Sequence, residues 1–179
     1  MPLHRDRPSR HGAVFTLATL VLAAACGGAP GGRHVIERDL GALSFRRYQR
    51  LLDVEFPVAG NPAVAHAATY VRREDGEDIS FSNAVVTVYD KPDGLAAAVA
   101  EQLRTLGTYI VTVHEEHGHH VFHLDGGDDR WDLWISGRHV VKVRAEPTTG
   151  RIPDDVISEY LSAFPSDLDA FGRAEGESP

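Results

Sequence analysis

The histidines are unevenly distributed along the 179-residue chain. Five of the ten lie within a stretch of ten residues, and imidazole is a ligand that suits zinc, copper and nickel. A zinc site needs three or four ligands in a defined geometry, so the fold of this stretch decides whether it can bind a metal. The five are His114, His117, His119, His120 and His123.

A β-hairpin is the structure that the His-rich stretch predicts. His117-Gly118 fits a two-residue turn between extended segments. That turn sets Thr112 opposite His123 and places His114 diagonally beside His123 on one face. The two imidazoles would then lie within reach of one metal ion.

Asp132 is the third ligand that we expect for such a metal. If Gly126-Gly127 is also a two-residue turn, Asp132 lies opposite Val121 on the next strand. Zinc would then be held by His114, His123 and Asp132. The alternative is an exposed His-rich hairpin tip with no metal, because the sequence contains neither HExxH nor a Cys/His zinc pattern.

The segment 130–134 carries both tryptophans of the chain. Trp131 and Trp134 are three residues apart, so on a strand they point to opposite faces. We expect Trp131 in the core and Trp134 beside Arg130 on the other face, where an exposed aromatic can anchor a partner. The alternative is that a loop or helix covers Trp134.

Motifs of catalysis are absent from the sequence. It contains no GxSxG elbow, no GxxxxGK[ST] loop and no GxGxxG after an apolar strand. The paired acids Asp128-Asp129 and Asp154-Asp155 fit a turn and the first turn of a helix. We therefore expect a binding or assembly role, with no cofactor unless the histidines hold zinc, and a hydrolase as the less favoured alternative.

The amino-terminal residues have the composition of an export signal. Arg5, Arg7 and Arg10 outnumber Asp6 in the first eleven residues, and an apolar run follows at 13–25. A membrane-spanning helix needs roughly 20 apolar residues. The run is shorter than that and fits the apolar region of a secretory signal.

Small residues lead from this run to the only cysteine, Cys26. Ala23-Ala24-Ala25-Cys26 resembles the lipobox of bacterial lipoprotein precursors, although Leu22 stands one place earlier than the usual leucine. The resemblance implies cleavage before Cys26 and a lipid on its thiol. Two or three acyl chains would anchor the protein stably to a membrane. The alternative is an ordinary secretory signal that leaves Cys26 as a free thiol.

Location and partners follow from this resemblance. We expect an exported protein, anchored to the cell membrane through lipid on Cys26 and able to contact another envelope protein. Gly27 after the cysteine resembles lipoproteins sorted to an outer membrane, facing the periplasm. The precursor carries a net charge of −8, and removal of residues 1–25 leaves about −10. An acidic surface repels phosphate backbones, so we expect no nucleic-acid partner.

The hydrophobic pattern predicts an α+β fold with a largely antiparallel sheet and helices packed on one face. The expected order is helix, three strands, helix, four strands, helix. The helices are expected at 44–52, 92–107 and 153–164, and the strands at 54–58, 67–72, 79–89, 109–115, 119–124, 130–135 and 139–144. We expect four segments, namely a signal peptide (1–25), a lipidated cysteine and flexible tether (26–43), one domain (44–171) and a disordered tail (172–179).

Overall fold

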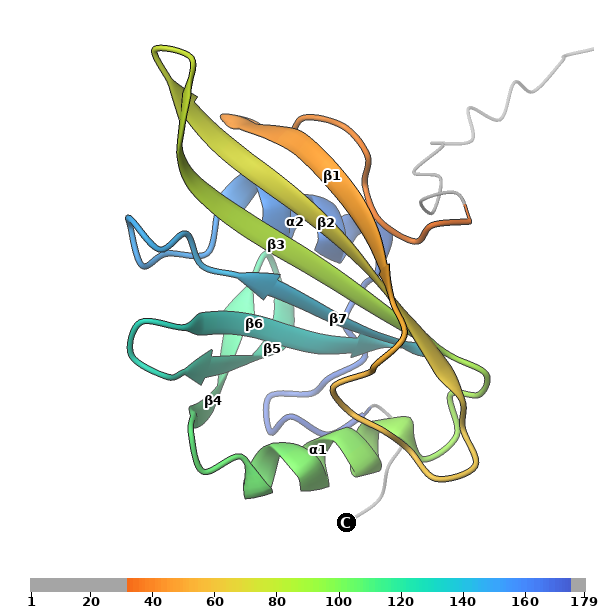
Figure 1. Cartoon of the computed structure of the whole chain (residues 1–179). Coiled ribbons are helices and arrows are strands. Elements are labelled where there is room, and N and C mark those ends of the chain that lie inside the picture. The colour runs from red at the N-terminus through yellow and green to blue at the C-terminus, as the bar shows by residue number, and fades with distance from the viewer. Residues whose placement is uncertain (1–31, 175–179) are drawn as a thin grey trace, which may run out of the picture.

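Seven strands form one antiparallel sheet in the computed structural model, which describes residues 32–174 (Figure 1). Their order across the sheet is β1-β2-β3-β7-β6-β5-β4. The largely antiparallel α+β fold is therefore confirmed, with strands predominating. The strands are β1 (Leu43–Leu51), β2 (Ala63–Glu74), β3 (Glu77–Tyr89), β4 (Ile110–Glu116), β5 (His119–Asp125), β6 (Arg130–Ser136) and β7 (His139–Arg144).

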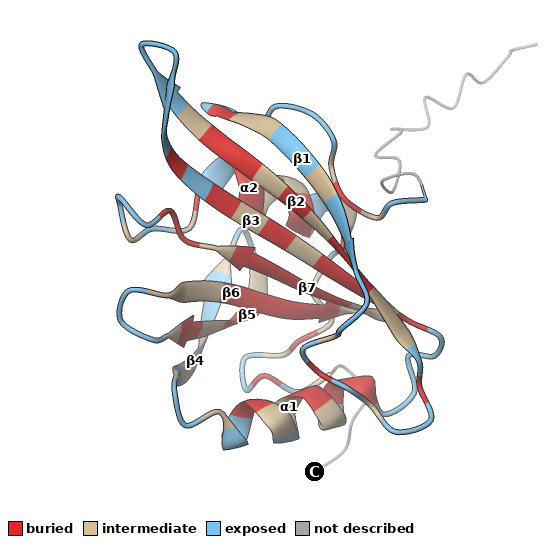
Figure 2. Ribbon diagram, in the orientation of Figure 1, coloured by how far each residue is buried: buried red, intermediate tan, exposed pale blue. Residues whose placement is uncertain are grey.

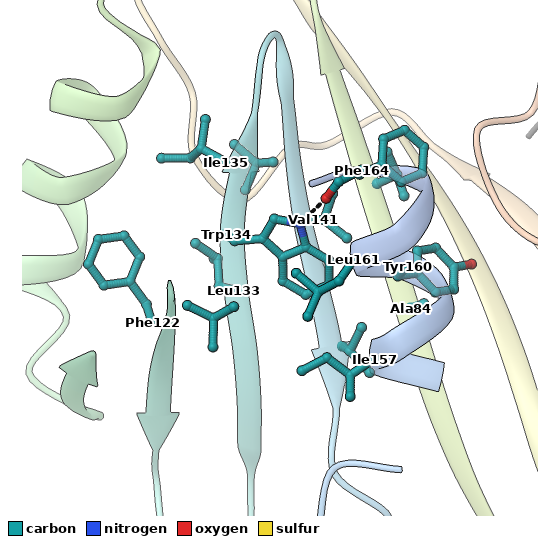
Figure 3. Packing of buried hydrophobic residues seen from close by; sticks show 14 of the residues in the cluster. Ala84, Phe122, Leu133, Trp134, Ile135, Val141, Ile157, Tyr160, Leu161 and Phe164 are labelled. Carbon is teal, nitrogen blue, oxygen red and sulfur yellow. Dashed lines mark hydrogen bonds between the residues drawn. The ribbon is translucent and has the colours of Figure 1, made fainter. Parts of the chain in front are cut away.

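The two helices, α1 (Leu95–Thr105) and α2 (Asp154–Ala163), lie at the positions expected for the second and third helices. They pack on opposite faces of the sheet, so the expectation of helices on one face is wrong. Along β6, Leu133 and Ile135 point toward the side of α1, and Trp134 points toward α2 (Figure 3). Both faces of β6 are therefore buried, which explains its nearly continuous apolar sequence.

The helix expected at 44–52 is wrong, because these residues form strand β1. A bulge between Phe45 and Arg47 inserts one residue into the pairing with β2. Phe45 and Tyr48 therefore lie on the same face, opposite Tyr70 and Ala68 respectively, although they are three residues apart. A β-bulge can therefore place side chains at positions i and i+3 on one face, which is the spacing that an amphipathic helix shows.

The strand expected at 54–58 is also wrong. These residues belong to the connection between β1 and β2, and Val58 makes only an isolated bridge with Asn61. Phe56 is nonetheless buried, and its carbonyl oxygen accepts a hydrogen bond from the Tyr89 hydroxyl at 2.6 Å. The alternating apolar residues thus mark a loop that is fixed to the core.

The remaining strands match the sequence pattern closely. The β2–β3 hairpin turns at Asp75-Gly76, and β4 to β7 form a meander. Figure 2 shows the most extensive burial along β6 and β7, in the middle of the sheet. The core therefore lies where both faces of the sheet are covered.

The packed domain extends beyond the limits that we expected. Val35 and Leu40 are buried, so packing begins within the segment assigned to the tether. At the other end Leu168 is buried and bridges to Ala174, beyond the expected start of the tail. The predicted signal peptide and Cys26 lie outside the described residues. Among residues 32–174, no helix has the length and apolar character required to cross a membrane.

Candidate functional site

The register of the His-rich hairpin is confirmed. Thr112 pairs with His123, and β4 and β5 are joined by the turn His117-Gly118. Both turn residues have positive φ angles, 48° and 78°, as a two-residue turn of this kind requires. The turn therefore fixes which histidines share a face.

His114 and His123 lie side by side on the face that α2 covers in part. Their ring centroids are 4.9 Å apart and their planes differ by 28°. The Nε2 atom of His114 also lies 2.8 Å from the Thr112 hydroxyl oxygen. The hairpin thus brings the two predicted imidazoles together, with one nitrogen of His114 already hydrogen-bonded.

Asp132 lies directly opposite His123 and not opposite Val121 as predicted. The β5–β6 loop has four residues, because Asp125 pairs with Arg130. The longer loop shifts the register of β6 by two residues, which keeps Asp132 on the same face. As a result Asp132 Oδ1 is 2.7 Å from His123 Nδ1.

The contact between His123 and Asp132 controls the protonation of the imidazole. Only 3% of Asp132 is exposed. Its hydrogen bond raises the pKa of His123 above the usual value of 6.5, and burial of the ring acts in the opposite direction. A carboxylate can only accept, so Nδ1 of His123 carries the proton. In the neutral ring Nε2 is then the atom free to accept a proton or bind a ligand.

A groove of about 340 Å³ runs beside this pair. Strands β4, β5 and β6 form one wall, and the segment that leads into α2 forms the other. Both acidic and basic side chains line it, and Ile152 and Ile157 provide the apolar surface. The lining residues are His114, Glu116, His123, Asp125, Arg130, Asp132, Gly150, Arg151, Ile152, Asp154 and Ile157.

Hydrogen bonds and ion pairs hold the two walls in place. The Arg130 guanidinium donates to Asp125 Oδ1 at 3.2 Å and to the Gly150 carbonyl oxygen at 3.1 Å. At the other end, His117 Nε2 lies 3.0 Å from Asp154 Oδ1. The groove is therefore bounded at one end by the contact of β6 with the segment before α2, and at the other by the contact of the β4–β5 turn with the first residue of α2.

Glu116 carries a carboxyl group whose proton affinity is altered by the groove. Burial raises its pKa above the usual value, and the charge of Asp132 raises it further. The nearby His117 and His114 oppose this shift. The sequence pattern did not identify Glu116 or the wall residues 150–154, because a periodicity argument does not show which loop covers a sheet face.

Trp134 is fully buried, so it is not an exposed partner contact as predicted. Helix α2 covers it, and its indole N–H donates to the Phe164 carbonyl oxygen at 2.7 Å (Figure 3). Trp131 packs against the core on the opposite face, with Lys142 Nζ 4.0 Å from its ring centroid. Arg130 is partly exposed and belongs to the groove.

The predicted metal ligands do not converge on one point. In the part of the chain from 32 to 174, no group of three or more His, Cys, Asp or Glu side chains is arranged to hold a metal ion. Asp132 lies behind His123 as its hydrogen-bond partner and does not extend into a shared ligand set. Zinc bound by His114 and His123 would need a third ligand that moves toward them.

Comparison with known proteins adds no further assignment to this site. No family model, curated protein or solved structure matches the chain.

Proposed function

We propose that the protein is a lipid-anchored binding protein of the cell envelope and that the groove beside His123 is its ligand site. The observation that supports this site best is the His123–Asp132 pair. A buried carboxylate holds the imidazole in one tautomer, and the same ring lines the groove. Fixed polar groups in a concave surface are typical of sites that orient a small ligand.

The lining residues favour binding over covalent catalysis. Among the described residues that line the groove, none is Ser, Thr, Cys or Lys, so the lining itself supplies no hydroxyl, thiol or amine nucleophile beside His123. The groove offers carboxylates at Glu116 and Asp154 and guanidinium groups at Arg130 and Arg151. This combination suits a small polar ligand that carries both hydrogen-bond donors and acceptors.

The membrane anchor is tested by metabolic labelling with a palmitate analogue. The wild-type chain should take up label, and Cys26→Ala should take up none, because the thiol is the acceptor. Gly28→Ala is the matched control, which keeps the cysteine and should keep the label. Label on Cys26→Ala, or none on the wild type, would overturn the lipid anchor.

Zinc binding in the groove is a second candidate function. The 4.9 Å separation of the His114 and His123 rings favours it, because two imidazoles bound to one ion lie about this far apart. In calorimetry with zinc on the full chain in detergent, His114→Ala with His123→Ala should abolish one site of submicromolar affinity. His119→Ala with His120→Ala is the control. If the heat of zinc binding is unchanged in the variant that carries His114→Ala and His123→Ala, this site is excluded.

A further inference from the structure

A second concave site, of about 420 Å³, lies where β1, β2 and β3 run side by side near the β2–β3 turn. Helix α1 lies at the opposite end of these strands, and none of its residues lines the site (Figure 1). We call this site the bulge cleft. Its lining residues are Arg46, Arg47, Thr69, Val71, Asp78, Ile79, Ser80, Phe81 and Asn83.

Two β-bulges supply side chains to the bulge cleft. The extra residue is Arg46 in β1 and Ile79 in β3. Consecutive residues of a regular strand point to opposite faces, but the bulge in β1 allows both Arg46 and Arg47 to line one cleft. Bulges are over-represented next to active sites, where they change the direction of a side chain. The two bulges therefore mark this end of the sheet as a place where a ligand can bind.

The two arginines of the bulge cleft carry charges that no ion pair neutralises. Within residues 32–174 neither Arg46 nor Arg47 lies in ion-pair contact with a carboxylate. Asp78 lines the same cleft, but its Oδ1 is already paired with Arg73 Nε at 2.7 Å. The hydrogen bond from Arg73 is the main cause of the lowered pKa of Asp78, and the charge of Arg46 contributes. The cleft thus presents two unneutralised guanidinium groups on a chain whose net charge is −8.

Apolar side chains lie in the same cleft as the two arginines. Ile79 is 39% exposed and Phe81 is 38% exposed, and Val71 pairs with Phe81 across the strands. The Arg144 guanidinium lies 5.4 Å from the centroid of the Phe81 ring, but its ion pair with Asp129 already neutralises it. Large apolar side chains that are exposed in a concave surface, beside a few polar groups, are typical of ligand sites.

We propose that the bulge cleft binds a phosphate monoester that carries an apolar or aromatic group. Two guanidinium groups provide paired N–H donors that match phosphate oxygens. Their two positive charges balance a monoester, which carries about −1.5 to −2 at pH 7, better than they balance a carboxylate. Ile79 and Phe81 contact the apolar group. This site is separate from the groove beside His123, and it stands whether or not Cys26 carries a lipid.

NMR titration of the full chain in detergent tests the site, with phenyl phosphate as the probe. We expect the amide signals of Thr69, Ile79 and Asn83 to shift and to saturate. The dissociation constant should be about 1 mM or lower, the range for a ligand of this size. Benzoate should bind more weakly because it has one charge. Benzyl alcohol has no charge and should not bind.

Variants separate the charged part of the bulge cleft from its apolar part. Arg47→Gln should weaken phenyl phosphate binding at least about 10-fold, because it removes charge-assisted hydrogen bonds. Arg46→Gln with Arg47→Gln should abolish it. Phe81→Ala should weaken binding of phenyl phosphate and leave that of inorganic phosphate unchanged. Arg50→Gln is the matched control, because it makes the same charge change on β1 outside the cleft lining. It should bind like the wild type.

The outcomes decide between a site and a general effect of charge. Saturable binding that is lost in the double arginine variant and kept in Arg50→Gln supports the site. A wild-type chain that does not bind phenyl phosphate overturns it, as does an equal loss in Arg50→Gln. Both cleft arginines are exposed, so their replacement should leave the circular dichroism spectrum unchanged.

Two sources could supply such a phosphate, a lipid headgroup or a soluble ester, and the detergent micelles can distinguish them. Phosphatidate added to the micelles should lower the apparent affinity for phenyl phosphate if a lipid headgroup reaches the bulge cleft. Phosphatidylglycerol, an anionic diester, is the control for the charge of the micelle. An affinity that phosphatidate lowers no more than phosphatidylglycerol does supports a soluble ester.

Discussion

The hydroxyl oxygens of Tyr70 and Tyr160 lie 2.9 Å apart beneath helix α2. Tyr70 donates to the Ile36 carbonyl oxygen at 2.6 Å, so the proton between the two hydroxyls comes from Tyr160. Tyr160 in turn accepts from the Ile36 N–H at 3.1 Å. The pair thereby satisfies both backbone groups of Ile36 and joins the segment before β1 to β2 and α2.

Tyr160→Phe should destabilise the domain, because it leaves the Ile36 N–H without an acceptor. An unsatisfied buried group costs about 1–3 kcal/mol. Urea unfolding should show this loss, and hydrogen exchange should show faster exchange at Ile36. Tyr109→Phe is the control, with a smaller expected cost, because its partner Asp129 is also bound by Arg144. Equal losses in the two variants would contradict the role of the tyrosine pair.

Trp134→Phe should cost more stability than Trp131→Phe. The first removes the buried hydrogen bond to Phe164 and leaves a cavity beneath α2, for about 2–4 kcal/mol in all. Within residues 32–174 the Trp131 indole N–H has no acceptor at normal hydrogen-bond geometry, so its replacement loses mainly packing and the contact with Lys142. Denaturant unfolding of both variants measures the difference. A Trp131→Phe loss equal to or larger than that of Trp134→Phe would contradict the buried position of Trp134.

Asp132→Asn should lower the pKa of His123, which the carboxylate raises above 6.5. The raised pKa means that the pair adds stability that is fully present below pH 6.5 and is lost as the pH rises through the folded-state value. NMR titration of the His123 ring protons measures the shift directly. Glu115→Gln is the control and should leave the titration unchanged. A His123 pKa that does not move in Asp132→Asn would show that the bond does not control this ring.

Acidification should act in the opposite direction at His34, His66 and His139. Their lowered pKa values mean that the folded state binds fewer protons than the unfolded state. Their contribution to stability is therefore present above pH 6.5 and is lost as the pH falls through the folded-state values.

The test of this pH effect is the difference in unfolding free energy between pH 7.5 and pH 5.5. His34→Asn removes one titrating ring and relieves its repulsion of the other two, so this difference should be smaller than in the wild type. His120→Asn should keep the wild-type difference. A His34→Asn variant that loses as much stability on acidification as the wild type would refute the effect.

Most of the sheet could be predicted because short sequence motifs specify its turns. The glycine-containing turn at 117–118 predicted the His-rich hairpin, and apolar stripes predicted both helices. Strand β1 could not be predicted from spacing alone, because its bulge places Phe45 and Tyr48 on one face at a helical interval. Apolar residues three positions apart can therefore belong either to a helix or to a strand that contains a bulge.

Only the part of the candidate site that lies within the β4–β5 hairpin could be predicted from the sequence. The proximity of His114 and His123 follows from a two-residue turn, whereas the position of Asp132 depended on the length of the next loop, which contains two more residues than expected. Trp134 lies on the predicted face, and helix α2 covers it, as the alternative stated; nothing in its own strand shows which of the two outcomes to expect. The cluster of His34, His66 and His139 brings together three separate segments, and no sequence interval relates them.

The fixation of Ile36 by the tyrosine pair has a consequence for how far the domain can travel. If Cys26 is lipidated, ten residues separate the membrane surface from this fixed point. An extended chain covers about 3.3–3.6 Å per residue, so the domain stays within about 35 Å of the bilayer. So short a tether keeps the domain in a thin layer next to the bilayer. A partner on the same membrane therefore has a high effective concentration for the domain. Partners on a more distant surface would have to come to it.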